Sequence, residues 1–309
     1  MQIKRRSFWL FLWTIAVFPI VAHAGTLYVN CGGHKGLTQI QKAINLLQQA
    51  QTSGSNTILV SGSCKENITI QSLDNLTLTA QNGASITDAS NGALDVIDVI
   101  DSRRVSINGF TINGGANGVV CNNYSLCRFS ANTIQNSVGT GVMVRSSQVR
   151  FEGDILQNNT AQGLGVVNGG QANGDSLTIH GNGNGVLVVA KGTLFLTNSV
   201  VQENQNVGLR AVEGSTLRII GSTVTGNGSN GVELDQSAQA RFEAFSGANG
   251  ITGNGGAGVF LGDLSFAFFD GNSNVTGNAG GTDVVCGTQF SATRGALTNI
   301  GGTTNCVEP

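Results

Sequence analysis

The sequence predicts an all-β protein, a right-handed parallel β-helix (solenoid) with an amphipathic capping helix at its N-terminal end. Three observations predict it. A Gly followed by Val or Leu recurs every 22 or 23 residues over the middle of the chain, short apolar segments separate these units, and asparagines accompany them. Repeats of this length are typical of solenoids, in which a coil buries its apolar side chains only by stacking on its neighbours.

The repeat is regular enough to be followed coil by coil. Successive intervals between the Gly units are 23, 22, 22, 23, 23 and 27 residues. The units begin at Gly118, Gly141, Gly163, Gly185, Gly208, Gly231 and Gly258. Two further apolar segments per unit, such as Leu194 to Leu196 and Val200 to Val201, indicate three strands per coil. A return to a parallel strand of the same sheet favours a right-handed crossover, and no six-residue subperiod points to a left-handed helix.

Asparagines precede most of the Gly units, which predicts a ladder of side-chain amides. The residues are Asn113, Asn136, Asn158, Asn204, Asn227 and Asn254. In stacked coils they would lie one above another at the strand spacing of ~4.8 Å, each bonding the next. The adjacent glycines are predicted to take a positive φ where the chain turns.

We interpret residues 1–24 as a signal peptide and residues 25–309 as one β-helix domain. A basic stretch from Lys4 to Arg6 precedes an apolar run from Phe8 to Val21, too short to cross a bilayer comfortably, and small residues follow it. We therefore expect export to a secreted, periplasmic or cell-surface location, with no membrane segment after cleavage. Cleavage leaves 13 basic and 18 acidic residues, a net charge of −5, which does not favour nucleic acid as a partner.

A helix is predicted just after the start of this domain. Leu37, Ile40, Ala43, Ile44 and Leu47 fall on one helical face, and Thr38 with Gln41 forms a possible capping box. Such a helix would cover the open strand edge of the first coil.

The six cysteines form three couples that are close in sequence, and an even number in an exported chain indicates disulfides. The couples are Cys31 with Cys64, Cys121 with Cys127, and Cys286 with Cys306. Six cysteines allow fifteen pairings, so these three are an interpretation. No couple has CxxC spacing and His34 is the only nearby histidine, so neither a metal nor another cofactor is expected.

The segment LTQIQKAINLLQQAQTSGSNTILVSGSCKENITI resembles the entry segment of the pectin-lyase-like β-helix superfamily, and it also looks like pectin methylesterases. With the repeats, the resemblance covers nearly the whole mature chain. It implies the β-helix fold and a role with carbohydrate.

Catalytic motifs of these families are incomplete here. Residues 151–160 resemble one strand of the pectin methylesterases, but the QD and LGRPW motifs are absent, so Asp154 lacks its family partners. The NTD, DD, GHG and RIK motifs of polygalacturonases, the YGFDPH motif of uronan epimerases and the GGxGxD calcium repeat are also missing. Whether the chain is an enzyme stays open, with lyase, hydrolase or esterase chemistry as the candidates.

Two candidate site groups come from aligning the coils on their glycines. His180 and Glu203 each lie five residues before a Gly unit, which predicts that they are neighbours, with His180 as a general base oriented by Glu203. Arg210 and Glu233 are also expected to be neighbours, and with Asp235 they are candidates for binding a substrate carboxylate. The alternative is solvated turn residues and a surface ion pair that contributes less than ~1 kcal/mol.

Two functions are compatible with these features. The first is binding or processing of an extracellular polysaccharide, acidic or of another kind. The second is a non-catalytic secreted or surface protein with a structural or adhesive role. The only tyrosines are Tyr28 and Tyr124, so the sequence offers few obvious aromatic platforms for sugar rings. The oligomeric state is left open.

Overall fold

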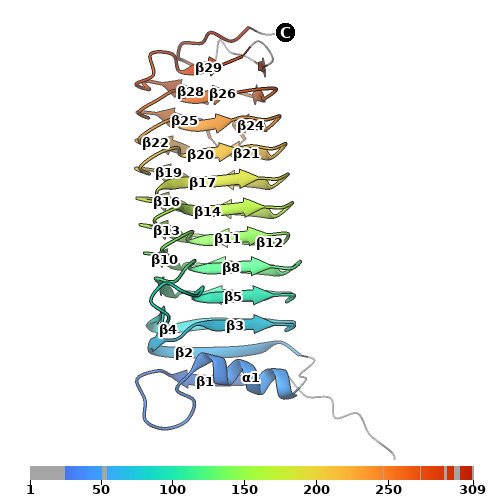
Figure 1. Ribbon diagram of the computed structural model, residues 1–309, viewed down its shortest axis with the longest axis vertical. Helices are drawn as coiled ribbons and strands as arrows, with labels where there is room; N and C mark the ends of the chain where they lie inside the picture. The colour runs from blue at the N-terminus through green and yellow to red at the C-terminus, as the bar shows by residue number, and fades with distance from the viewer. Residues whose placement is uncertain are drawn as a thin grey trace, which may run out of the picture.

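The computed structural model describes residues 25–50, 54–245, 247–271, 273–288, 291–295 and 300–307. The predicted signal peptide lies outside these residues. The described chain forms a column of stacked coils with one helix at its N-terminal end (Figure 1). Its named strands pair in parallel with strands of the next coil, which confirms a parallel β-helix.

The named strands form two hydrogen-bonded sheets, and the larger one bends at a corner into two faces, which are called the second and third sheets below. The first sheet contains ten of the described strands. They are β3 (Ile68–Gln71), β5 (Ile97–Ile100), β8 (Val119–Asn122), β11 (Val142–Arg145), β14 (Gln162–Val167), β17 (Asn184–Val189), β20 (Leu209–Ala211), β23 (Val232–Leu234), β26 (Val259–Leu261) and β29 (Val284–Cys286).

The second and third sheets meet at a tight corner, which the long strands β2 (Asn56–Lys65) and β4 (Leu76–Thr87) turn without interruption. The second sheet continues with β6 (Val105–Asn108), β9 (Leu126–Ser130), β12 (Gln148–Glu152), β15 (Gln171–Asp175), β18 (Thr193–Thr197), β21 (Thr216–Ile220), β24 (Gln239–Glu243), β27 (Phe266–Phe269) and β30 (Ala292–Gly295), and β1 (Thr26–Asn30) pairs with β2. The third sheet contains β7 (Thr111–Asn113), β10 (Thr133–Gln135), β13 (Ile155–Gln157), β16 (Thr178–His180), β19 (Val200–Gln202), β22 (Thr223–Thr225), β25 (Asn249–Thr252) and β28 (Ser273–Thr276).

The aliphatic residues that follow the repeated glycines form one buried column. Val119 pairs in register with Val142, Val142 with Leu164, and Leu164 with Val186. All four side chains are fully buried. This confirms that equal-length coils stack like on like, so each side chain packs against its equivalents above and below.

Phenylalanines fill the interior beside these columns, among them Phe129, Phe151 and Phe242. The ring centroids of Phe129 and Phe151 are 5.4 Å apart. Phe242 stacks on Phe269 with a centroid distance of 4.8 Å and an interplanar angle of 7°. Aromatic pairs at such distances add to the stability that burial alone provides.

A buried ladder of asparagines lies between the third and first sheets. In each coil the backbone N–H and the side-chain Nδ2 both donate to Oδ1 of the asparagine in the next coil, for example from Asn204 to Asn227 at 3.1 and 2.9 Å. The members are Asn159, Asn182, Asn204, Asn227, Asn254 and Asn278. The ladder and its last three predicted positions are confirmed.

The first three predicted positions were wrong. Asn113, Asn136 and Asn158 lie outside the ladder, and Asn113 instead accepts a hydrogen bond from Asn136 at 2.7 Å on the surface. These three residues lie five positions before their glycines, whereas most ladder members, such as Asn159, lie four positions before theirs. The turn is one residue shorter after Asn182, which lies three positions before Gly185, than after Asn204, which lies four positions before Gly208.

The repeated glycines are needed for close packing rather than for a left-handed backbone. None of the seven is among the glycines with positive φ, so the predicted conformation was wrong. A Cβ atom on Gly208 would lie 2.6 Å from the carbonyl oxygen of Gly231 and 2.8 Å from Nδ2 of Asn227. These distances are too short for carbon, so a side chain here would push adjacent coils apart.

The predicted helix is α1 (Ile40–Ala50), and it buries Ile40, Ala43, Ile44 and Leu47 against the first coil. The partner of its N-terminus is Glu66 rather than the expected capping box. The carboxylate of Glu66 accepts the N–H groups of Ile40 and Gln41 at 2.8 and 3.1 Å. Residues from the first coil therefore hold the cap in place.

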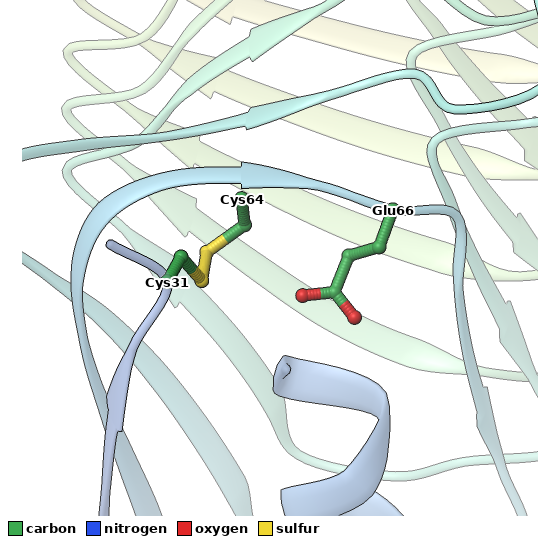
Figure 2. A group of neighbouring side chains, drawn as sticks. All are labelled: Cys31, Cys64 and Glu66. Carbon is green, nitrogen blue, oxygen red and sulfur yellow. A yellow bond between two sulfur atoms is a disulfide. The ribbon is translucent and has the colours of Figure 1, made fainter. Parts of the chain in front are cut away.

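All three predicted disulfides are present. Figure 2 shows the Cys31–Cys64 bond beside Glu66, above the first turn of α1. The two sulfur atoms and a carboxylate oxygen of Glu66 lie within 4.8 Å of one another, which is close enough for three ligands of one metal ion. However, both sulfur atoms are joined to each other and the carboxylate accepts helix N–H groups, so this cluster acts as a structural clamp.

The close approach of the glycine column gives a direct test. We expect Gly208→Ala to destabilise the protein by about 1–3 kcal/mol, because the added methyl group overlaps two atoms of the next coil. Gly250→Ala is the control, since a Cβ atom there has its nearest neighbour at 3.8 Å and the backbone is that of an ordinary strand. Chemical denaturation measures both, and equal midpoints for the two variants would contradict the packing argument.

Candidate functional site

His180 and Glu203 occupy different columns. His180 ends β16 and lies in register with Gln157 and Gln202. Glu203 follows β19 in a left-handed turn conformation, with a φ of 53°, and its carbonyl oxygen accepts the N–H of Gly181. The structure therefore sets the two residues one position out of register. The short turn after Asn182, described above, causes this offset.

Arg210 and Glu233 are brought together as predicted. They are register partners on β20 and β23, and Arg210 Nε lies 3.0 Å from Glu233 Oε1. Glu233 also accepts a hydrogen bond from the Asn230 amide at 3.1 Å. Asp235 Oδ1 accepts the N–H groups of Gln236 and Asp263, at 2.8 and 2.7 Å, so this carboxylate fixes a turn.

The outer face of the second sheet carries a larger group of candidate binding residues, arranged in columns. Strand alternation and coil register place a column of polar and aromatic side chains there, one from each coil. The column reads Arg128, Arg150, Asn173, Phe195, Arg218, Arg241 and Phe268. A second column beside it includes Glu152, Asp175, Thr197 and Glu243.

Two equivalent clusters of two arginines and one glutamate lie along these columns. Arg128 and Arg150 approach Glu152 at 2.6 and 2.9 Å. Arg218 and Arg241 approach Glu243 at 2.6 and 2.5 Å. The hydrogen bond from Arg128, helped by the charge of Arg150, holds the pKa of Glu152 below its ordinary value. Glu152 is thus kept as an anion that neutralises part of the arginine charge.

A groove of about 420 Å³ lies between the two clusters, over β12, β15 and β18. Its lining offers different chemical groups: the Arg150 guanidinium, the Asn173 amide, the Asp175 carboxylate, the Phe195 ring and the Thr197 hydroxyl. The guanidinium carbon of Arg218 lies 4.8 Å from the centroid of the Phe195 ring. This cation–π contact fixes the ring at the upper end of the groove.

The groove was not anticipated from the sequence. One signal was available, the repeated triplet Arg-Phe-Glu at residues 150–152 and 241–243, in which the arginine and glutamate point outward and the phenylalanine inward. Phe195 gave no such signal, because only the register of β18 shows that its ring lies on the outer face.

Directly beneath this face is Asp154, a fully buried carboxyl group. Its Oδ1 accepts both the N–H and the Nδ2 of Asn132 at 2.8 Å, and its Oδ2 accepts the N–H of Glu152 at 3.0 Å. Burial, which disfavours the charged form, raises the pKa of Asp154 to about 6 despite these hydrogen bonds. The carboxyl group of Asp154 therefore has no access to solvent.

Comparison with known proteins assigns the chain to a family. Residues 117–274, just over half of the 309 residues, match the family described as right handed beta helix region, and the chain belongs to this family. This agrees with the predicted right-handed coil and with the predicted superfamily.

The chain is also similar to one sequence relative and to solved β-helix structures. It is 34% identical over 137 residues to a cell surface glycoprotein from Methanothermus fervidus, a match that covers 44% of this chain but only 22% of the relative. It resembles pectate lyase Pel9A with a TM-score of 0.56 and 14% identity, over 87% of this chain and 73% of that chain.

The A-module of the mannuronan C-5 epimerase AlgE4 from Azotobacter vinelandii has a TM-score of 0.61 and 14% identity, over 86% of this chain and 94% of that chain. At these identities both likenesses concern the fold. Among the described residues, no helix is long and apolar enough to cross a membrane.

The buried Asp154 predicts an unusual pH dependence of stability. With a folded-state pKa near 6, above the ordinary value of 3.8, stability is greatest below that ordinary value and falls as the pH rises through 6. Asp154→Asn removes the titrating group, so we expect the stability of the variant relative to the unmodified protein to be about 1–3 kcal/mol more favourable at pH 8 than at pH 4.

Chemical denaturation at a series of pH values measures this effect. Asp175→Asn serves as the control, because it removes an exposed carboxylate from the neighbouring strand β15. If Asp154→Asn and the unmodified protein lost stability in parallel between pH 4 and 8, the buried charge would not be its cause.

Proposed function

We propose that this protein is an exported β-helix that binds an extracellular polysaccharide in the groove over the second sheet. The observation that carries the proposal is the groove between the two arginine–glutamate clusters, with the fixed Phe195 ring at one end. An apolar ring surrounded by a few oriented polar groups is a common form of small-ligand site. The fold likeness to a pectate lyase and a mannuronan epimerase supports a saccharide as the ligand.

The groove supports binding better than hydrolysis. Cleavage by paired carboxyl groups needs one protonated acid beside one carboxylate at the reacting bond. Here two arginines favour the charged form of Glu152, and Asp154, whose pKa is raised, is buried below the surface. Acid–base chemistry by His180 and Glu203 stays a separate hypothesis, located on the third sheet rather than in the groove.

Export and a surface location form part of the same proposal. The predicted signal peptide at residues 1–24 would be removed, leaving residues 25–309 as one β-helix domain. The three disulfides favour an oxidising compartment. The relative from Methanothermus fervidus is a cell surface glycoprotein, which supports the same location, although the chain spans 22% of it. Binding of a polysaccharide without turnover would also be compatible with the alternative, a non-catalytic protein with an adhesive role.

The proposal is tested by removing the ring. We expect Phe195→Ala to weaken polysaccharide binding about tenfold, equivalent to ~1.4 kcal/mol, because the apolar end of the groove is lost. Affinity electrophoresis in gels containing neutral or acidic polysaccharides measures the change. Phe245→Ala is the matched control, since this ring is 77% exposed on a loop and does not line the groove.

The same polysaccharides can be screened for products. Failure of the intact protein to bind any of them would contradict the proposal. Product formation that disappears in both His180→Ala and Glu203→Ala would instead favour an enzyme acting through the third sheet.

A further inference from the structure

Tyr124 is held at the corner between the first and second sheets by a short covalent loop. The disulfide between Cys121 and Cys127 closes this loop. The N–H of Tyr124 donates to the carbonyl oxygen of Ser146 at 2.9 Å, and the Ser125 hydroxyl donates to the carbonyl oxygen of Asn122 at 2.6 Å. The side chain itself is 79% exposed. A large aromatic ring is therefore presented to solvent on a fixed backbone.

Tyr124 lines a second hollow of about 360 Å³ on this corner. Leu126, which is 37% exposed, adds an apolar surface beside the ring. The other lining side chains carry hydroxyl or amide groups: Ser146, Gln148, Asn168 and Gln171. Such groups donate and accept hydrogen bonds without carrying charge.

The second hollow adjoins the groove described above. Gln148 and Arg150 are successive outward residues of β12, and Gln171 and Asn173 are successive outward residues of β15. One residue of each pair lines the second hollow and the other lines the groove. Outward neighbours on a strand are only ~7 Å apart, so the two depressions meet along both strands.

Together they extend obliquely across the second sheet, from the coil of β9 to the coil of β18. That is three coil spacings, or ~14 Å, with Tyr124 near one end and Phe195 near the other. Among the lining residues of both depressions, the only charged side chains are Arg150 and Asp175, one of each sign.

We propose that the two depressions form one binding groove for a single extended, uncharged polysaccharide chain, with Tyr124 and Phe195 as sugar-ring platforms at its two ends. This inference rests on the proposed function and goes further, because it defines the length, direction and charge class of the ligand. The positive charges of Arg128 and Arg150 are balanced by the negative charges of Glu152 and Asp175, which leaves no net charge to attract a uronate. Because the disulfide loop is already ordered, little conformational entropy is lost when a sugar ring stacks on Tyr124.

The test uses graded lengths of three probe series: oligosaccharides of glucose, of N-acetylglucosamine and of galacturonate. Isothermal titration calorimetry compares the unmodified protein with Tyr124→Ala and Phe195→Ala. We expect one of the two neutral series to bind, with affinity rising with length until the groove is filled. Tyr124→Ala should weaken the longest probe about tenfold and leave the shortest unchanged, whereas Phe195→Ala should weaken every length.

Tyr28→Ala is the control, because Tyr28 is 67% exposed on β1 and lines neither depression. Tyr124→Phe should bind as the unmodified protein does, since the ring is kept. A long probe that is sensitive to Phe195→Ala but not to Tyr124→Ala would overturn the single groove and leave the proposed function standing. Tightest binding to galacturonate would overturn the charge assignment. If no probe bound, the proposed function and this inference would both fail.

Discussion

The structure depends on the in-register stacking of coils at the strand spacing of ~4.8 Å. The asparagine ladder shows why the register is so strongly fixed. Each buried amide is bonded to the coils directly above and below, for example Asn204 to Asn182 and Asn227. A slip of one residue would leave buried donors without acceptors, which is far costlier than the loss of an exposed hydrogen bond. The glycine column then lets the coils approach closely enough for these bonds to form.

The same register organises the outer surface. Because equivalent positions lie above one another, an arginine repeated at one position becomes a column of charge, and the glutamate two residues later becomes its counterion. This arrangement produces the clusters around Glu152 and Glu243. The groove appears where the repetition is interrupted, since Asn173 and Phe195 replace arginine in two successive coils. In a rigid solenoid, a groove can thus arise from a change of outward-facing residues alone, without a change in the backbone.

The interior could be predicted from the sequence and much of the site could not. The buried column from Val119 to Val186 follows directly from the spacing of the glycines, because aliphatic residues beside a strictly repeated glycine must stack. His180 and Glu203 lie one position out of register because a turn one residue shorter shifts one side of the coil and not the other. Glu66 as the helix partner is a contact between distant segments, which no local pattern indicates. Phe195 resembles a core residue until the direction of its strand is known.

The charges show most clearly why the properties of the surface could not be predicted without the structure. Residues 25–309 carry a net charge of −5, and Arg210 was expected to bind a carboxylate of the ligand. In the folded protein, Arg210 is already paired with Glu233, and four arginines of the second sheet are paired with Glu152 or Glu243. An arginine whose charge is matched within the fold attracts an anionic polymer only weakly, although its planar face still packs on an aromatic ring, as Arg218 does on Phe195. Arginine content therefore indicates how this face is held together, while the polar and aromatic groups between the clusters line the groove that we propose as the binding site.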